Sequence, residues 1–197
     1  MYHSKYNQIL QLIKAKQPVH LVGPAGSGKT TLLQQVATEL GLDCYSLTLT
    51  RQTSEGNLLG FKSVTGEYIP SRLRHIVEHG GLLDLSEINA ADPNVLICLN
   101  SIENGYIEFP DKRVNIHPDF RLAATSNPDD NVYSGRSKLD FSTTDRYLTI
   151  FLDLDTDLEA SLTSPEFSSN LSIIRKALIT SGVSQQLTMR GALKLFN

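Results

Sequence analysis

Apolar residues along the chain are spaced in two alternating ways. Short apolar runs bounded by glycine, proline or asparagine predict buried strands, and apolar residues that recur every three or four positions predict amphipathic helices. Strands are expected at 18–22, 43–49, 82–86, 121–127 and 147–154, and helices at 4–16, 31–41, 71–81, 92–105, near 138–146, at 166–182 and at 187–197. Strands that alternate with helices in this way are typical of an α/β fold with a parallel sheet.

Two segments interrupt this alternation and predict β-hairpins. The stretch 61–70 has a Thr-Gly turn between two β-prone arms, and the stretch 106–120 has a Pro-Asp turn. Beyond residue 155 the pattern is wholly helical. We therefore expect an α/β domain over 1–155 and a small helical domain over 156–197.

The composition narrows the class of protein. With 197 residues, 40% hydrophobic residues and a formal net charge of −3, the chain can bury a core and has no general basic footprint for nucleic acid. Cys44 and Cys98 lie far apart and outside any CxxC pair, which favours a reducing compartment and excludes a cysteine-based zinc site. No stretch approaches the roughly 20 apolar residues of a membrane span, so we expect a cytoplasmic protein with no membrane partner.

The segment GPAGSGKT at 23–30 indicates the chemistry. It matches G-x-x-x-x-G-K-[ST] between a predicted strand and a predicted helix, which is the context that this phosphate-binding motif requires. Its glycines let backbone N–H groups face phosphate oxygens at the positive end of the helix dipole. In such a loop Lys29 neutralises the β and γ phosphates of ATP, and the Thr30 hydroxyl ligates Mg²⁺. The residues expected to contact the nucleotide are Gly23, Pro24, Ala25, Gly26, Ser27, Gly28, Lys29, Thr30 and Thr31.

Four later segments follow this loop in a familiar order. They read GGLLDLSEIN, RLAATSNP, YSGRSKLDFSTTDRY and LTMRGAL, and over roughly residues 18–195 the chain resembles AAA+ ATPases, most closely the MoxR-like and dynein-related branch. The resemblance implies a P-loop NTPase fold, a three-layer sandwich around a parallel sheet, with two inserted β-hairpins and a short C-terminal helical lid. It also implies a ring of six subunits that uses Mg-ATP and acts on a client protein or nucleic acid.

The same resemblance implies roles for single residues. Glu87 corresponds to the acid that polarises the attacking water, and Asn127 to the sensor 1 amide that orients this water. Arg190 resembles the sensor 2 arginine at the start of a lid helix. Arg146, in DRY, corresponds to the arginine finger that reaches the γ phosphate of a neighbouring subunit, with Arg136 as a second candidate and a solvated surface pair as the alternative for each.

The strand segment LLDLSEIN departs from the family pattern, because Ser86 stands where the family has a magnesium-binding aspartate. On a strand, Asp84 and Ser86 face one side and Glu87 faces the other, and Asp84 lies about 6.6 Å behind Ser86. We therefore expect Ser86 to serve Mg²⁺ through a water, and Asp84 to be a buried acid that needs a hydrogen-bonding partner. Direct metal binding by Asp84 stays open as the alternative.

Two further patterns could indicate functional sites, but each is also explained by ordinary surface side chains. His75, Glu78 and His79 spell H-x-x-E-H, a zinc peptidase pattern, but no third ligand is evident and we expect surface side chains. Three basic residues in or after the first hairpin could contact a substrate in a central pore, although a solvated face is the expected role. These residues are Lys62, Arg72 and Arg74.

Three functions therefore stay open at the level of sequence. The first is an AAA+ ATPase that couples hydrolysis to remodelling of a macromolecular partner. The second is a nucleotide-binding regulatory or assembly module with little turnover, because Ser86 alters the metal site. The third is a P-loop kinase for a small molecule, which would be a monomer.

Overall fold

The computed structural model describes residues 1–128, 145–181 and 187–196. Its centre is a parallel five-stranded sheet with the strand order β2-β5-β8-β1-β9. The strands span Val19–Val22 (β1), Cys44–Thr48 (β2), Gly81–Ser86 (β5), Phe120–Ser126 (β8) and Leu148–Phe151 (β9). All five coincide with predicted strands, so the predicted parallel α/β sheet is confirmed.

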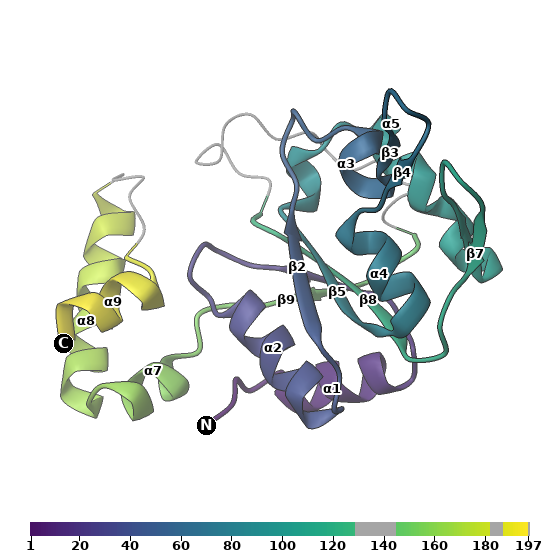
Figure 1. Cartoon of the computed structure of the whole chain (residues 1–197). Helices are drawn as coiled ribbons and strands as arrows, with labels where there is room; N and C mark the ends of the chain where they lie inside the picture. Colours follow the sequence, from purple (N-terminus) through teal and green to yellow (C-terminus); the bar gives the residue numbers. More distant parts are fainter. Residues whose placement is uncertain (129–144, 182–186, 197) are drawn as a thin grey trace.

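Helices cover both faces of the sheet (Figure 1). Helices α1 (Tyr6–Lys14) and α2 (Lys29–Glu39) pack on one face in a core that includes Leu82 of β5. Helix α4 (Arg72–His79) packs on the other face in a second core that includes Leu83. Neighbouring residues of β5 thus enter opposite cores, as strand geometry requires, and the predicted three-layer sandwich is confirmed.

The two predicted hairpins are present as two small antiparallel sheets. Strands β3 (Phe61–Lys62) and β4 (Tyr68–Ile69) form the first, and β6 (Tyr106–Glu108) and β7 (Arg113–Asn115) form the second. The paired segments are shorter than the predicted arms. The first hairpin joins α3 (Glu55–Leu59) to α4, and the second precedes β8.

The Arg74 side chain of α4 contacts both hairpins. Its Nη1 donates to Asp111 Oδ1 in the second hairpin at 2.8 Å, and its Nε lies 2.8 Å from Glu78 Oε1. The guanidinium also covers the rings of Tyr68 and Phe109, with its carbon 5.4 and 4.7 Å from the ring centroids. Arg74 is 6% exposed, so the prediction of a solvated basic face is wrong for this residue. Two carboxylates and two aromatic faces replace part of the hydration that this cation loses on burial.

The helical predictions differ from the structure in two places. The helix predicted at 92–105 begins as expected, with an Asp92 cap and Pro93 in the first turn, but only Pro93–Leu96 (α5) is α-helical. Ile97–Asn104 continues as a 3₁₀ helix (η2). Helix α3 was not predicted, although a capping box between Ser54 and Asn57 starts it. The helix expected near 138–146 lies outside the described residues, apart from its last two.

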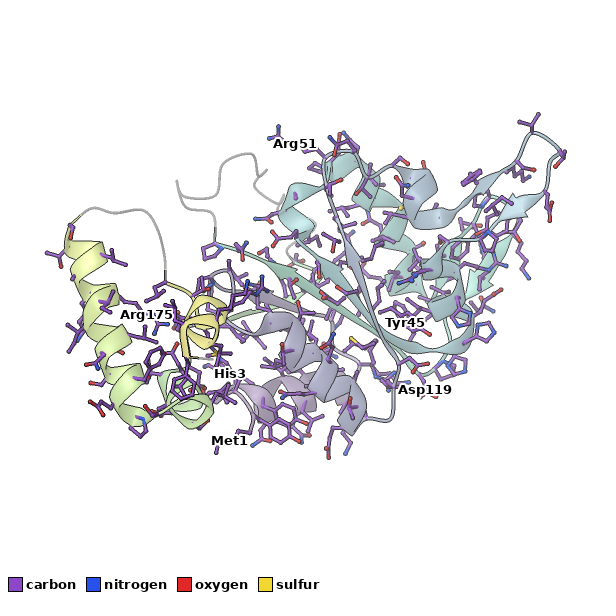
Figure 2. The ribbon with its side chains drawn as sticks, turned by 60° about the vertical axis from the view of Figure 1, so that its left-hand side comes forward. Met1, His3, Tyr45, Arg51, Asp119 and Arg175 are labelled. Atoms are coloured by element: carbon purple, nitrogen blue, oxygen red, sulfur yellow. The ribbon has the colours of Figure 1, made fainter. Side chains whose placement is uncertain are left out.

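Three helices follow the sheet: α7 (Thr156–Leu162), α8 (Pro165–Thr180) and α9 (Met189–Phe196). They form a separate cluster beside the core (Figures 1 and 2). The cluster begins within two residues of the domain boundary expected at 155. Among the described residues, no helix is long and apolar enough to cross a membrane.

Candidate functional site

The carboxyl ends of β2, β5 and β8 open into a cavity of about 380 Å³. The phosphate-loop residues Ala25–Thr31 form one wall of this cavity, apart from Ser27, and Arg190 of α9 closes it. Ser86, Glu87 and Asn127 lie on its floor. Ligands of open parallel sheets bind at this end of the strands, so the cavity is the candidate site.

The loop 23–28 adopts the backbone that the glycines predict. Gly26 and Gly28 have φ angles of 75° and 87°, which side chains rarely tolerate. Gly23 packs so closely on the Leu152 carbonyl that any side chain there would clash. Lys29 then begins α2 directly after Gly28, so the first N–H groups of the helix face the cavity. Oxyanions are the ligands that such a helix start binds best.

A chain of polar contacts crosses the cavity. The buried Lys29 ammonium donates to Gly23 O, Pro24 O and Asn127 Oδ1, with distances of 2.6, 2.9 and 3.0 Å. The Asn127 amide in turn donates through Nδ2 to Glu87 Oε1 at 3.2 Å. The structure therefore brings together Lys29, Asn127 and Glu87, which lie far apart in sequence and which sequence analysis selected separately.

The direction of Glu87 differs from the expected one. Strand alternation would place Glu87 on the face opposite Ser86, but β5 ends at Ser86 and Glu87 has a left-handed backbone with φ 58° and ψ 44°. A non-glycine residue is rarely found in this conformation, which costs free energy and is common at functional sites. Because of this left-handed backbone, Ser86 and Glu87 line the same cavity.

Asp84 lies beneath the cavity floor and has the partners it was expected to need. It is fully buried, and its Oδ2 accepts hydrogen bonds from Ser86 Oγ at 2.7 Å and from Ser46 Oγ of β2 at 3.0 Å. Burial raises the pKa of the Asp84 carboxyl, and these two hydroxyls oppose the rise. Asp84 and Ser86 therefore share one face of β5, as predicted.

Helix α9 lies against the phosphate loop. The Thr188 side chain packs on Gly26, where an added Cβ would come within 2.9 Å of it, and Arg190 lines the cavity. A second cavity of about 680 Å³ continues between the loop, α7, α9 and the N-terminus. Figure 2 labels Met1 and His3 on this side of the molecule. Sequence analysis missed this second cavity, because its residues come from segments that are distant along the chain.

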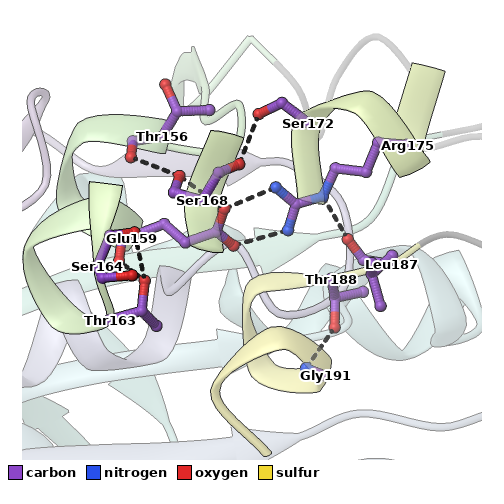
Figure 3. Close-up of polar contacts among 10 residues, drawn as sticks. All are labelled: Thr156, Glu159, Thr163, Ser164, Ser168, Ser172, Arg175, Leu187, Thr188 and Gly191. Carbon is purple, nitrogen blue, oxygen red and sulfur yellow. Dashed lines mark hydrogen bonds and ion pairs between the residues drawn. The ribbon is translucent and has the colours of Figure 1, made fainter. Parts of the chain in front are cut away.

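A buried ion pair fixes the start of α9 (Figure 3). Glu159 of α7 is 1% exposed and receives both terminal nitrogens of Arg175 of α8, each at 2.7 Å. Arg175 Nε also donates to the Leu187 carbonyl at 2.7 Å, one residue before Thr188. The bidentate ion pair and the hydrogen bond to Leu187 connect α7, α8 and the start of α9. They place Thr188 and Arg190 beside the phosphate loop.

Arg146, the first finger candidate, does not line this cavity. Arg146 lies two residues before β9, with its Nε 2.8 Å from Glu103 Oε1 of η2. It lines other hollows, next to Asn100 and Glu103. Arg136 lies outside the described residues.

The side chains of His75, Glu78 and His79 on α4 are exposed, as expected. The rings of His75 and His79 stack 4.4 Å apart, the His79 Nδ1 is 2.9 Å from the His75 carbonyl oxygen, and Glu78 pairs with Arg74. Within residues 1–128, 145–181 and 187–196, no group of three or more potential ligands could hold a metal. Cys44 and Cys98 are both free thiols.

Two relatives are similar to this chain in sequence. The chain is 30% identical over 175 residues to gas vesicle ATPase GvpN1 of Halobacterium salinarum, a match that covers 73% of this chain and 49% of the relative. It is 28% identical over 206 residues to midasin of Dictyostelium discoideum, covering 94% of this chain and 3% of midasin. The chain thus spans about half the length of the first relative and a small part of the second.

Solved structures support the same fold. A crystal structure of a protein from Cytophaga hutchinsonii aligns with a TM-score of 0.63 at 19% identity, covering 100% of this chain and 58% of that protein. NtrX from Brucella abortus aligns with a TM-score of 0.57 at 17% identity, covering 86% of this chain and 39% of NtrX. The model of the AAA domain, dynein-related subfamily, matches residues 18–147, which is more than half of the sequence. The chain therefore belongs to the dynein-related subfamily of AAA ATPase domains.

Proposed function

We propose that this chain binds Mg-ATP in the cavity at the ends of β2, β5 and β8 and hydrolyses it to remodel a macromolecular partner. The observation that carries the proposal is the contact chain from Lys29 through Asn127 to Glu87. It combines a phosphate-binding cation, an orienting amide and a carboxylate within hydrogen-bond distance of one another, which are the groups that phosphoryl transfer to water requires.

Each residue of this chain has a distinct role in the proposal. The backbone N–H groups of the loop and Lys29 bind the β and γ phosphates. Glu87 accepts a proton from the attacking water, and Asn127 holds Glu87 and the water in position. Arg190 reaches the same phosphates from α9. Thr30 and, through a water, Ser86 would hold Mg²⁺, which would supply positive charge to neutralise the phosphates.

The second cavity is proposed to take the base and ribose. It adjoins the phosphate loop at Gly26 and Gly28 and is walled by apolar side chains of α7 and α9, such as Leu158 and Met189. A purine ring is flat and apolar, so this lining suits it. We also propose the division into an α/β domain over 1–155 and a helical lid over 156–197, since the cavity lies between the two.

The position of Arg146 suggests an assembly in which a second subunit completes the site. Arg146 lies away from the cavity of its own chain and pairs with Glu103 on the surface of η2. A ring of six subunits would bring this arginine to the neighbouring nucleotide, where a planar cation stabilises the charge of phosphoryl transfer. The client is a protein or a nucleic acid.

A nucleotide-binding module with little turnover is the second candidate, and the observation that favours it is the uncharged Ser86 at the metal site. Steady-state phosphate release and native mass with and without ATP distinguish the two. We expect ATP to promote a larger assembly that releases phosphate continuously. Binding and assembly without release would instead support the regulatory module.

Arg146 offers a test of the shared site. We expect Arg146→Ala and Lys29→Ala subunits each to be inactive alone and to recover part of the ATPase activity when they are mixed, because some interfaces then contain an intact Lys29 and an intact Arg146. Phosphate release from mixtures at several ratios measures the recovery. Mixed rings that form but stay inactive would contradict a role for Arg146 in the neighbouring site.

A further inference from the structure

A buried carboxylate lies directly below the uncharged position 86. Asp84 does not line the candidate cavity, whereas Ser46 and Ser86 do. Asp84 Oδ2 lies 3.0 Å from Ser46 Oγ and 2.7 Å from Ser86 Oγ, and the two hydroxyls are 2.8 Å apart, so their two hydrogens are shared among these three contacts. The serines are therefore the layer between a buried negative charge and the space where Mg-ATP would bind.

The direction of these hydrogen bonds decides what the serines offer to the cavity. A serine hydroxyl has one hydrogen and two acceptor lone pairs. When its hydrogen is donated to Asp84 or to the other serine, the hydroxyl can only accept on the cavity side. Waters bound to Mg²⁺ present hydrogens outwards, and Mg²⁺ keeps several waters in protein sites. The carboxylate polarises the hydroxyl oxygens of Ser46 and Ser86, which makes them better acceptors for hydrogen bonds from such waters.

We propose that Asp84 supplies the negative charge of the magnesium site through the hydroxyls of Ser46 and Ser86, as a positioning residue that does not touch the metal. This inference rests on the proposed function, because it concerns the metal of the same nucleotide. It assigns to three residues on two strands the task that one aspartate at position 86 performs in the family.

Two other roles for Asp84 give different expectations. Asp84 could bind the metal directly, but it is fully buried and outside the cavity lining. It could also serve only to hold β2 on β5, since Ser46 and Asp84 are register partners on these strands. Direct binding would make the effect of Asp84 independent of the serines, and a purely structural role would leave the metal affinity unchanged.

The test is the Mg²⁺ dependence of binding of a fluorescent, non-hydrolysable ATP analogue, which needs no turnover. We expect Asp84→Asn to weaken the apparent Mg²⁺ affinity about tenfold, as is usual for outer partners of metal ligands. The analogue's affinity without Mg²⁺ should not fall, because the variant removes a negative charge from below the phosphates. Asparagine has the same shape, but it is uncharged and its amide can donate to the serines and reverse their direction.

A double-mutant cycle separates the three roles. The Ser46→Ala, Ser86→Ala pair should lose as much Mg²⁺ affinity as Asp84→Asn, and adding Asp84→Asn to this pair should change little further. Ser86→Asp combined with Asp84→Asn should regain the affinity, because the acid then lies at the cavity. Wild-type Mg²⁺ affinity in Asp84→Asn, or an equal further loss in the serine-free background, would overturn the proposal.

The measurements distinguish a failure of the Asp84 proposal from a failure of the proposed nucleotide-binding function. If Asp84→Asn fails to fold, the serine pair decides, and unchanged Mg²⁺ affinity in that variant overturns the inference. If the unaltered chain fails to bind the analogue with or without Mg²⁺, the proposed function is wrong and the inference falls with it. Binding that responds to Mg²⁺ but not to these residues overturns the inference alone.

Discussion

Replacing Lys29 with alanine is expected to lower the affinity for Mg-ATP by about a hundredfold, since one charge-assisted hydrogen bond contributes about 1.5–3 kcal/mol and two phosphates lose this partner. The Lys29 ammonium is buried among the oxygens of Gly23, Pro24 and Asn127, so the fold has already fixed it beside the loop. All three of its hydrogens are donated to these oxygens, so binding ATP exchanges at least one of the contacts for a phosphate oxygen at the same place. Isothermal titration of both proteins with the non-hydrolysable analogue measures the difference.

Lys14 provides the matched control for this experiment. It lies exposed at the end of α1, so Lys14→Ala removes the same charge from the protein without touching the loop. We expect its affinity for the analogue to equal that of the unaltered chain. Equal affinity in Lys29→Ala as well would show that the loop does not bind phosphate.

The sequence predicted those parts of the molecule that depend on local pattern. Strand runs, the phosphate loop and the two hairpin turns each follow from residues that are close along the chain. The parallel sheet then follows from their alternation, because parallel strands need a crossover between them. The relative placement of Lys29 and Asn127 at adjacent strand ends is a consequence of that sheet.

The features that sequence reasoning missed depend on long-range contacts. Arg74 looks like one more surface cation on a helix, and its burial follows only when Tyr68 and Phe109 of two separate hairpins enclose it. Glu87 was assigned to the wrong face because alternation was extended one residue beyond the end of β5. A left-handed residue at a strand end leaves no signal when it is a glutamate, since glycine is the usual marker.

The second cavity, between the phosphate loop, α7 and α9, was missed for the same reason. His3, Leu158 and Met189 come from the N-terminus and from two helices far along the chain, and only Met189 belongs to a segment that the sequence singled out. The link between them is the buried Glu159–Arg175 pair, which holds the start of α9 near the loop. An acid and a base separated by many residues do not reveal their pairing in sequence, because their partners are set by helix packing.

Replacing Glu87 with glutamine is expected to keep Mg-ATP binding and to lower turnover at least tenfold, which is about 1.4 kcal/mol in the activation barrier. Loss of a general base commonly costs about 10² to 10⁴ in rate, so the effect should exceed this minimum when chemistry limits turnover. Glutamine retains an oxygen that can accept the hydrogen bond from Asn127 Nδ2, which in the structure is 3.2 Å from Glu87 Oε1. The contact chain can therefore persist while the proton acceptor is lost.

Glu87→Gln is informative because nucleotide affinity and turnover are measured separately. Glu67 lies exposed on the first hairpin, so Glu67→Gln makes the same change in charge and should alter neither quantity. Unchanged phosphate release by Glu87→Gln would remove Glu87 from the mechanism, because no other group in the contact chain can accept a proton: Lys29 is a donor and Asn127 is an amide. A parallel loss of nucleotide affinity would instead indicate that Glu87 orders the cavity through Asn127. Slow turnover with intact affinity is the result expected of a base held in place by its left-handed backbone.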